Sequence, residues 1–214
     1  MMGFDMGIYE RKQREREQRK SEILDAARKV FSEKGLHTAT MEKIASEAEL
    51  SPGTLYLYFK NKEELHTSLS IEILKRLVKE VHKVVKLDIS VEEKIEKFMD
   101  VFIEIYDYDS NILINLFHLQ SGETLMNLSD DVLKEIKKYS TQSHRAIVDV
   151  IRQGIEQGIF IDEHPVALAD ILWASYAGIV LWVDSKRLLN NKKDFVKSTL
   201  RTAFSIIGKG IKKV

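Results

Sequence analysis

The stretch from Thr40 to Leu65 constrains the fold of this chain more than any other part of the sequence. Thr40 is a good helix N-cap, and apolar residues recur after it at helical spacing, which predicts a short helix with one apolar face. Pro52 and Gly53 then interrupt the pattern, because proline has no backbone N–H to donate and glycine tolerates a sharp bend. A second short helix is predicted over Thr54–Phe59.

Two short helices joined by a tight turn are typical of a helix-turn-helix, whose second helix enters the DNA major groove. Leu55 and Phe59 are four residues apart and are expected to face inward. A threonine on the outer face can hydrogen-bond a base edge, and tyrosine hydroxyls can reach phosphate oxygens. Lys62 begins the next helix, where its ammonium group can pair with a phosphate. The same spacing also fits a helical hairpin with core aromatic residues and no role in DNA binding.

The run from Ala45 to Leu65 resembles the DNA-binding signature of the TetR family of transcriptional regulators, and Ile23 to Gly35 resembles that family's first helix. The resemblance covers residues 21–65 and implies a three-helix DNA-binding unit. Pro52 and Leu57 depart from it, since the family often carries polar residues there; Leu57 can contact a thymine methyl instead. The predicted DNA-binding residues are Thr40, Ser51, Pro52, Gly53, Thr54, Tyr56, Leu57, Tyr58 and Lys62.

The charge balance gives no general attraction to nucleic acid. The chain has 33 Lys and Arg against 33 Asp and Glu, and through His66 the numbers are 12 and 12. Attraction to phosphate therefore depends on where charges are placed, and we expect weak non-specific DNA binding. With no cysteine and no histidine cluster at ligand spacing, we expect neither a metal site nor a cofactor.

Six Lys and Arg between Arg11 and Lys20, opposed there only by Glu15 and Glu17, form a basic arm. The arm either extends the first helix or stays disordered until it meets DNA. It resembles arms that follow a phosphate backbone, but it is equally a solvated helix end. Residues 1–20 are thus predicted to be an arm, 21–66 a DNA-binding domain and 67–214 an effector-binding and dimerisation domain.

The whole chain is predicted to be all-α, with no β pattern and only two prolines. Ser21 is the expected N-cap of the first helix. The remaining long segments of helical periodicity are Lys62–Lys86, Ser90–Tyr106, Ile112–Gly122, Val132–Gln157, Val166–Arg187 and Lys193–Lys212. The most apolar run, Ile171–Val183, has 13 residues, whereas a membrane span needs about 20, so we expect a buried helix, no membrane contact and a cytoplasmic protein.

The last two helices carry apolar residues on more than one side, which predicts that an extra face is buried. A second copy of the chain would cover it through a four-helix interface, as the resemblance also implies. The alternative is that both helices are central within one subunit. The candidate interface residues are Ile179, Trp182, Leu200, Phe204 and Ile207.

In TetR-like proteins the region between the long linking helix and the last two helices holds a cavity for a small effector. The large apolar residues there are candidates for its lining, although the same residues also suit an ordinary core: Phe98, Phe102, Tyr106, Leu116, Phe117, Trp173 and Tyr176. His118 and His144 offer polar contacts. Such a lining predicts a hydrophobic or amphipathic effector.

The sequence as a whole predicts a homodimeric repressor that is released from a palindromic operator by a small effector. One alternative is an enzyme acting on a hydrophobic molecule, but no Ser/His/Asp spacing, HExxH or glycine-rich phosphate loop supports it, so we expect no catalysis. Another alternative is a structural DNA binder without an effector, which neutral charge and the specific motif disfavour.

Overall fold

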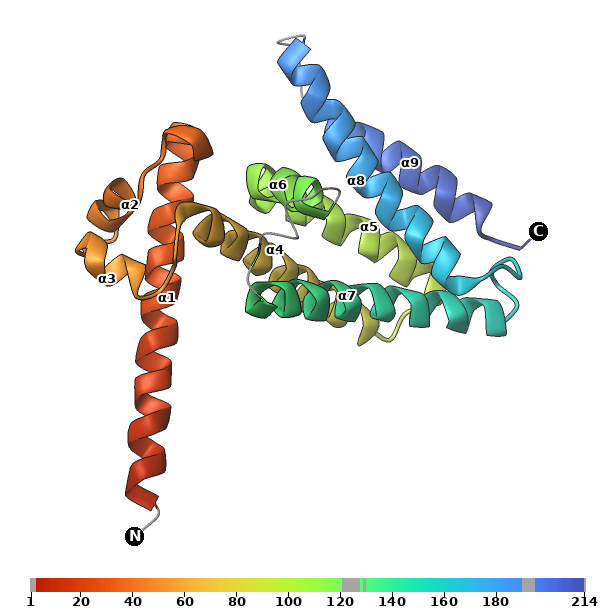
Figure 1. Ribbon diagram of the computed structural model, residues 1–214. Coiled ribbons are helices and arrows are strands. Elements are labelled where there is room, and N and C mark those ends of the chain that lie inside the picture. The colour runs from red at the N-terminus through yellow and green to blue at the C-terminus, as the bar shows by residue number, and fades with distance from the viewer. Residues whose placement is uncertain (1–2, 121–127, 129, 190–194, 214) are drawn as a thin grey trace. The chain divides into compact units, whose positions relative to one another are not determined.

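The computed structural model describes residues 3–120, 128, 130–189 and 195–213, and it divides into two compact units, residues 1–69 and 70–214. Within these residues the regular elements are helices, and one isolated antiparallel bridge joins Phe160 and Lys212. The prediction of an all-α fold is confirmed (Figure 1).

The first unit contains α1 (Gly3–Thr38), α2 (Met41–Glu47), α3 (Pro52–Tyr56) and the first turns of α4 (Lys62–Val85). Helix α2 packs on both α1 and α3. The core residues contributed by α1 recur at helical spacing: Ile23, Leu24, Ala26, Ala27, Val30 and Phe31.

Helix α1 begins well before the predicted cap at Ser21, so of the two alternatives for the basic arm the structure shows the helical extension. Ser21 was expected to cap it, but the helix already runs from Gly3, so the basic arm is its N-terminal half. Charged pairs one helical turn apart support this extension, including Arg11 with Glu15 at 3.4 Å and Arg19 with Glu22 at 2.8 Å. Each such pair stabilises a helix by about 0.2–0.5 kcal/mol. Gly35 interrupts the helix, with a φ of 73°.

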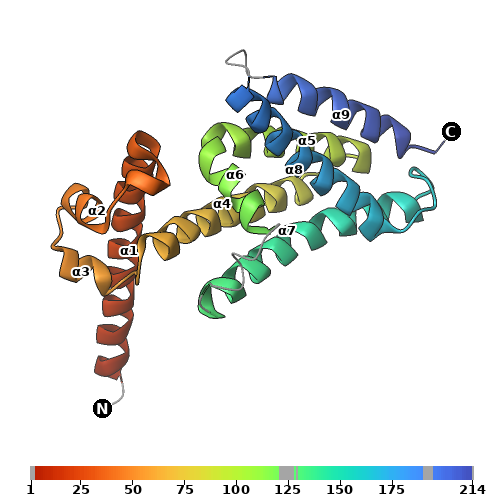
Figure 2. The same ribbon diagram turned by 45° about the horizontal axis from the view of Figure 1, so that its top comes forward.

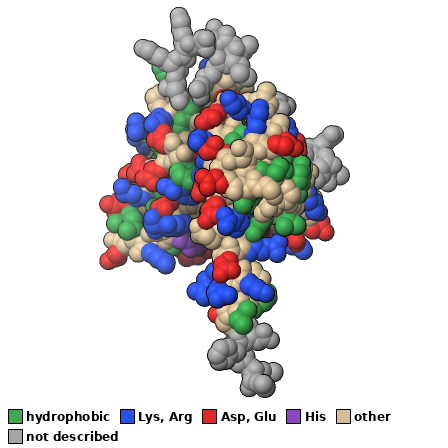
Figure 3. Space-filling model, turned by 90° about the vertical axis from the view of Figure 1, so that its left-hand side faces the viewer, with side chains coloured by type: hydrophobic (Ala, Val, Ile, Leu, Met, Phe, Trp, Pro, Cys, Tyr) green, Lys and Arg blue, Asp and Glu red, His purple; other side chains and the backbone are tan. Residues whose placement is uncertain are grey.

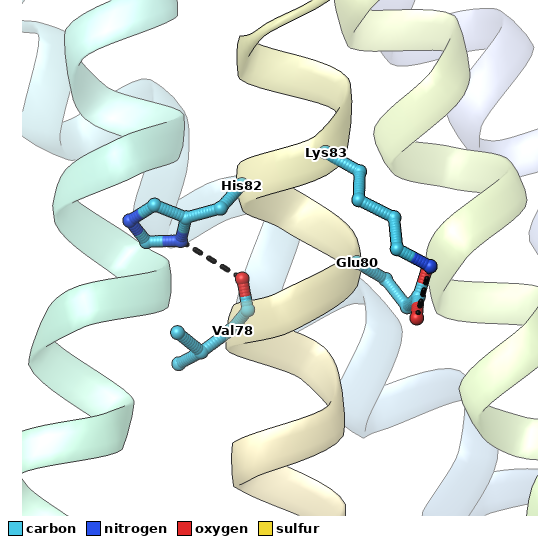
Figure 4. A network of polar contacts seen from close by, with 4 residues as sticks. All are labelled: Val78, Glu80, His82 and Lys83. Atoms are coloured by element: carbon cyan, nitrogen blue, oxygen red, sulfur yellow. Dashed lines mark hydrogen bonds and ion pairs between the residues drawn. The ribbon is translucent and has the colours of Figure 1, made fainter.

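Helix α4 is continuous across the boundary between the units, which falls after Leu69. One apolar stripe of this helix is buried along its length: Leu65, Leu69, Ile73, Leu77, Val81 and Val84. Near its C-terminal end, polar side chains bond within the helix (Figure 4). His82 Nδ1 donates to the Val78 carbonyl at 2.8 Å, and Lys83 Nζ lies 2.7 Å from a Glu80 carboxylate oxygen.

The second unit adds α5 (Val91–Tyr108), α6 (Ser110–Gln120), α7 (Asp130–Glu156), α8 (Pro165–Leu189) and α9 (Val196–Gly210). Helix α5 packs on α6, α7 and α9, and α8 packs on the same three helices (Figure 2). The core of this unit therefore lies between α5 and α8. The predicted helix end at Gly122 and the predicted helix start at Lys193 lie outside the described residues.

The start of α5 is fixed locally by a capping box. Ser90 Oγ accepts from the Glu93 N–H, and the Glu93 carboxylate accepts from the Ser90 N–H. This backbone hydrogen bond, with that from the Ser90 side chain, lowers the pKa of Glu93. The sequence prediction that Ser90 begins this helix is confirmed.

The packing of the chain after α7 requires a glycine at position 154. The Phe160 ring packs so closely against Gly154 that an added Cβ would lie 2.2 Å from a ring carbon. The chain reverses through Gly158 at φ 71°, and the Phe160 N–H donates to the Gly154 carbonyl at 3.1 Å. Phe160 is thereby buried, and this fixes the chain between α7 and α8.

Replacing Gly154 with alanine should destabilise the second unit by about 1–3 kcal/mol, because the buried Phe160 ring would have to leave its site. Both tryptophans, Trp173 and Trp182, lie in this unit, so urea unfolding followed by tryptophan fluorescence reports on it. The matched control is Gly7→Ala in α1, where nothing lies within 4 Å of an added Cβ. Equal stability of the two variants would contradict the packing argument.

Candidate nucleic-acid interface

The turn before α3 is made by Glu49, not by the proline and glycine that the sequence suggested. Glu49 has a φ of 55°, in the left-handed region that reverses the chain after α2. Pro52 and Gly53 instead form the first turn of α3. Proline is well suited to this position, since its φ is already helical and its missing N–H would have no helical partner.

Two side-chain N-caps fix the starts of α2 and α3. Thr40 Oγ1 accepts from the Lys43 N–H at 3.3 Å, confirming it as the N-cap of α2. Ser51 Oγ accepts from the Thr54 N–H at 3.1 Å and lies 2.8 Å from Thr54 Oγ1. Ser51 was not predicted to be a cap, although a serine directly before a proline is a recognisable helix start.

The side chains of α3 divide as the helical spacing predicted. Leu55 and Phe59 are buried and attach α3 to the rest of the unit. Tyr56 and Leu57 are 50% and 75% exposed, a large exposure for apolar and aromatic residues. Thr54 is half-buried. Its hydroxyl contacts the Ser51 hydroxyl, and its methyl group takes no part in that contact. The structure therefore presents a tyrosine and a leucine outward.

The Lys62 ammonium group hydrogen-bonds to backbone carbonyls of its own unit. Its Nζ donates to the carbonyl oxygens of Leu36 at 3.0 Å and Ala39 at 3.3 Å. These carbonyls lie on either side of the end of α1, so the ammonium group fixes the chain between α1 and α2. The predicted phosphate contact of Lys62 remains a prediction, and the structure gives this residue a second, structural use.

The basic arm lies beside the end of α3. The Arg16 guanidinium is 6.0 Å from the centre of the Tyr58 ring, and Lys20 Nζ is 5.8 Å from the Phe59 ring. Both contacts join the N-terminal half of α1 to the residues that follow α3. The arm is thus a rigid neighbour of the outward-facing residues.

Negative charge is also present near these residues. The Glu42 carboxylate lies at the N-terminus of α2, where a hydrogen bond from its own backbone N–H, followed by one from Thr40, lowers its pKa. Positive and negative side chains are mixed over the face that Figure 3 shows. A phosphate at the N-terminus of α2 would have to displace the Glu42 carboxylate.

In the second unit, the predicted effector residues form a packed aromatic cluster. The Phe102 and Tyr176 rings stack with centres 4.7 Å apart, and Phe117 lies edge-on to Tyr176 at 5.4 Å and to Trp173 at 5.6 Å. The Tyr176 hydroxyl donates to the Phe102 carbonyl at 2.7 Å, and burial raises its pKa well above the usual value. Six of the seven predicted residues are buried: Phe98, Phe102, Tyr106, Leu116, Phe117 and Tyr176. Trp173 is half-buried.

A cavity of about 270 Å³ lies next to this cluster, between α7 and α8. Of the seven predicted effector residues, Trp173 is the one that lines this cavity. Its lining is Ser140, Thr141, Ser143, His144, Ile147, Ala169 and Trp173. His144, which the sequence suggested as a polar contact, is among them, and its Nε2 lies 2.8 Å from Asp170 Oδ1. The described residues hold no group of three or more His, Asp or Glu side chains suited to a metal ion.

The predicted dimer interface needs correction. Leu200 and Phe204 are completely buried within the chain itself and have no surface to offer a partner, because α9 turns them toward α5 and α8. Ile179 and Ile207 are half-buried. Trp182 is 62% exposed, and Ile171 and Ile206, which the prediction omitted, are 50% and 66% exposed.

The exposed side of α8 is a stripe at helical spacing, consisting of Ile171, Ala174, Gly178 and Trp182. By length and composition, the 22-residue stretch Pro165–Lys186 of α8 is apolar enough to cross a membrane, and a third of it is buried. The core helix of a soluble protein passes the same test. This stretch is longer than the apolar run Ile171–Val183, which ends at the charged residues Asp170 and Asp184.

Comparison with known proteins identifies a matching family and several relatives of this chain. Residues 23–69 match the family described as "Bacterial regulatory proteins, tetR family". The chain is 29% identical over 149 residues to the fatty acid metabolism regulator protein of Bacillus subtilis, covering 69% of this chain and 74% of that protein. It is also 29% identical over 163 residues to the transcriptional repressor KstR2 of Mycobacterium tuberculosis, covering 73% and 79%.

Solved structures share the fold. The regulator FadR from Bacillus subtilis, solved in complex with stearoyl-CoA, superposes with a TM-score of 0.69 at 21% identity, over 89% of this chain and 98% of that chain. PfmR from Thermus thermophilus, a TetR family regulator, superposes with a TM-score of 0.70 at 20% identity, over 89% and 99%.

Replacing Lys62 with methionine should lower the free energy of unfolding of the first unit by about 1.5–3 kcal/mol, because two backbone carbonyls would lose a charged donor. Amide hydrogen exchange within α1 and α2 measures the effect. Lys60→Met is the matched control, since Lys60 is exposed. Equal protection in both variants would show that the ammonium group is not needed to hold this segment.

Proposed function

Because this chain belongs to the TetR family of transcriptional regulators, we propose that it is a homodimeric repressor that a small hydrophobic effector releases from a palindromic operator. The observation that carries the DNA-binding part is the geometry of α3. Leu55 within this short helix and Phe59 just after it are buried, whereas Tyr56 in its last position and Leu57 at its C-cap are exposed. These two adjacent exposed side chains offer a partner one apolar and one hydrogen-bonding contact.

Each outward residue has a distinct role in this proposal. Tyr56 and Tyr58 donate their hydroxyls to phosphates, which positions α3 without reading sequence. Leu57 and the Thr54 methyl contact base edges, with thymine methyls as their natural partners. Gly53 lets the backbone approach closely, beside Ser51 and Pro52, and Thr40 contacts a phosphate at the start of α2.

The basic arm adds phosphate contacts to the same surface. It is helical, it lies beside Tyr58 through Arg16, and its cations are mostly exposed. Since the first unit has no net positive charge, these local cations supply its attraction to DNA. Lys62 is the weakest member of the predicted set, because its ammonium group already serves Leu36 and Ala39.

Dimerisation follows from the exposed stripe on α8. A second copy covers Ile171, Ala174, Gly178 and Trp182, with Ile206 of α9 adding apolar area. Small residues in the centre let two helices approach closely, and a tryptophan at the end supplies a large apolar contact. The same covering accounts for the apolar character of α8 in a cytoplasmic protein, without a membrane.

The effector acts through α4 in this mechanism. This helix belongs to both units, so a ligand that prefers one arrangement of the second unit shifts the population of the first. The relatives support an apolar effector, since the Bacillus subtilis regulator was solved with stearoyl-CoA and KstR2 is a ketosteroid transcriptional regulator. An enzymatic role has no comparable support, because the relatives above are regulators.

Selection of bound sequences from a random duplex pool tests the DNA-binding proposal. We expect a two-fold palindrome that binds at least about a thousandfold more tightly than random duplex, with affinity falling between about 50 and 200 mM salt. Tyr56→Phe should weaken binding about five- to tenfold for every duplex, by removing one hydrogen bond. Tyr139→Phe, in the second unit, is the control. Equal binding of random and selected duplex would reject sequence-specific regulation.

Replacing Trp182 with glutamate should weaken the dimer by about 30-fold or more, since it puts a charge where an exposed tryptophan is covered. Sedimentation velocity over a concentration series measures the monomer–dimer equilibrium. Leu87→Glu is the control, because Leu87 is an exposed apolar residue outside α8 and α9. A Trp182→Glu protein that dimerises like the parent would assign the interface to another surface.

A further inference from the structure

The six cations of the basic arm lie on different sides of α1. We propose that Lys12, Arg16 and Lys20 form a separate phosphate-binding face, which holds the DNA backbone beside α3 whatever its base sequence. The other three cations of the arm, all arginines, take no part in it. That the bound anion is duplex DNA rests on the function proposed above; the division of the arm into two sides does not.

Helical spacing places the three residues on one face. Lys12, Arg16 and Lys20 follow one another at intervals of four residues, so their side chains stand one above another along α1. Ile23 and Ala27, three and seven residues after Lys20, are buried in the core of the first unit. The phosphate-binding face therefore continues the buried side of α1 beyond the point where the core ends.

Contacts within the first unit place this face beside α3. The Arg16 guanidinium lies 6.0 Å from the centre of the Tyr58 ring, and Lys20 Nζ lies 5.8 Å from that of Phe59. Tyr58 and Phe59 directly follow Leu57, the exposed C-cap of α3. The N-terminal half of α1 continues past this point in both ribbon views (Figures 1 and 2). A duplex held by α3 therefore has this face of α1 next to it.

The acidic residues of the arm pair with cations on the other sides of the helix. Glu15 pairs with Arg11 at 3.4 Å, and Glu22 pairs with Arg19 at 2.8 Å. Around Arg16 the pattern is different, because none of its neighbours one turn before or after is acidic. These neighbours are Lys12, Gln13, Arg19 and Lys20.

The three cations of the face therefore repel one another without a compensating carboxylate. Within the described part of the chain, no ion pair joins Lys12, Arg16 or Lys20 to an Asp or Glu side chain. Like charges four residues apart destabilise a helix, whereas opposite charges at that spacing stabilise it. A row of phosphates removes this repulsion, since each strand of a duplex carries one negative charge about every 3.4 Å along its axis. The face spans about 12 Å from Lys12 to Lys20, the length of three to four such steps.

Two double variants with equal changes in charge test the face. Lys12→Gln with Arg16→Gln removes two of its cations, and Arg11→Gln with Arg14→Gln removes two from the other sides of the helix. All four residues are exposed, and glutamine has nearly the helix propensity of lysine and arginine, so both proteins should keep the parent fold. Fluorescence anisotropy measures the affinity of the full chain for selected and random duplex between about 50 and 200 mM salt. Circular dichroism measures the helix content of each variant.

The expected result is a difference in salt dependence. In the face variant, the plot of log affinity against log salt concentration should become less steep by about 1.8 per bound chain, or about 0.9 for each lost phosphate contact. The control variant should change this slope by less than about 0.5. At about 100 mM salt the face variant should bind selected and random duplex about tenfold more weakly, because phosphates carry no sequence information. Equal slopes for the two double variants would reduce the effect to net charge and overturn the proposal.

A second matched pair tests the end of the face next to α3. Lys20→Gln should reduce the slope by about 0.9, whereas Arg19→Gln should leave it nearly unchanged, because the Arg19 guanidinium is already paired with Glu22. An effect of Arg19→Gln as large as that of Lys20→Gln would overturn the assignment of Lys20 to the face.

A lipid surface is the other polyanion that this arm could meet, since Ile8 and Tyr9 at its start are exposed apolar residues. Vesicles of phosphatidylglycerol separate the two partners. A Lys12→Gln, Arg16→Gln protein that loses vesicle binding but keeps the duplex affinity and salt slope of the parent would overturn the proposal and assign the face to lipid.

The phosphate-binding face and the proposed function fail in different ways. A strongly preferred duplex, bound with equal slopes by the two double variants, would retain the regulator and reject the face. Equal binding of random and selected duplex, with a reduced slope in the face variant alone, would retain the face and reject sequence-specific regulation.

Discussion

A helix of five residues does not form by itself in water, so everything that α3 does depends on how it is attached. Burial of Leu55 and Phe59 supplies most of that attachment, and Ser51 and Pro52 fix where the helix begins. These contacts use the inner side of α3 and its start. Tyr56 and Leu57 are therefore free to face outward, and the candidate DNA surface is a direct consequence of the packing beneath it.

The same unit shows how one cation can have a structural use inside a surface motif. Lys62 was predicted from its position to meet a phosphate, yet it bonds to the carbonyls of Leu36 and Ala39. Glu42 likewise places a carboxylate where the N-terminus of α2 would attract an anion. In the proposed complex with DNA, affinity would therefore depend more on the arm and the tyrosines than on the N-terminus of α2. The neutral overall charge is consistent with binding that relies on fit.

In the second unit, aromatic packing and cavity are separate features that lie side by side. The stacked pair Phe102 and Tyr176, with Phe117 against it, fills the space between α5, α6 and α8. Trp173 has one side on this cluster and another on the α7–α8 cavity. A ligand in the cavity would thus contact the core through one residue, which gives a short physical route from binding to the packing of α8.

The sequence by itself determined those features that depend on neighbours within about one turn. Examples are the Thr40 and Ser90 caps, the break at Gly35, and the buried stripes of α1 and α4, because capping and helical periodicity are local properties. The family resemblance identified the DNA-binding stretch before its geometry was known. Local signals did not distinguish between two possible positions for the turn before α3. The turn was predicted at Pro52 and Gly53, but the residue with positive φ is Glu49.

Only the tertiary structure decided which apolar side of a helix is covered by its own chain. Leu200 and Phe204 were indistinguishable in sequence from Ile171 and Ile206, since all four are apolar residues on helices with more than one apolar side. Packing of α9 against α5 and α8 buries the first pair and leaves the second exposed. The cavity at Ser140 has the same origin, because a void between two helices depends on how side chains from both meet, which periodicity along one chain does not specify.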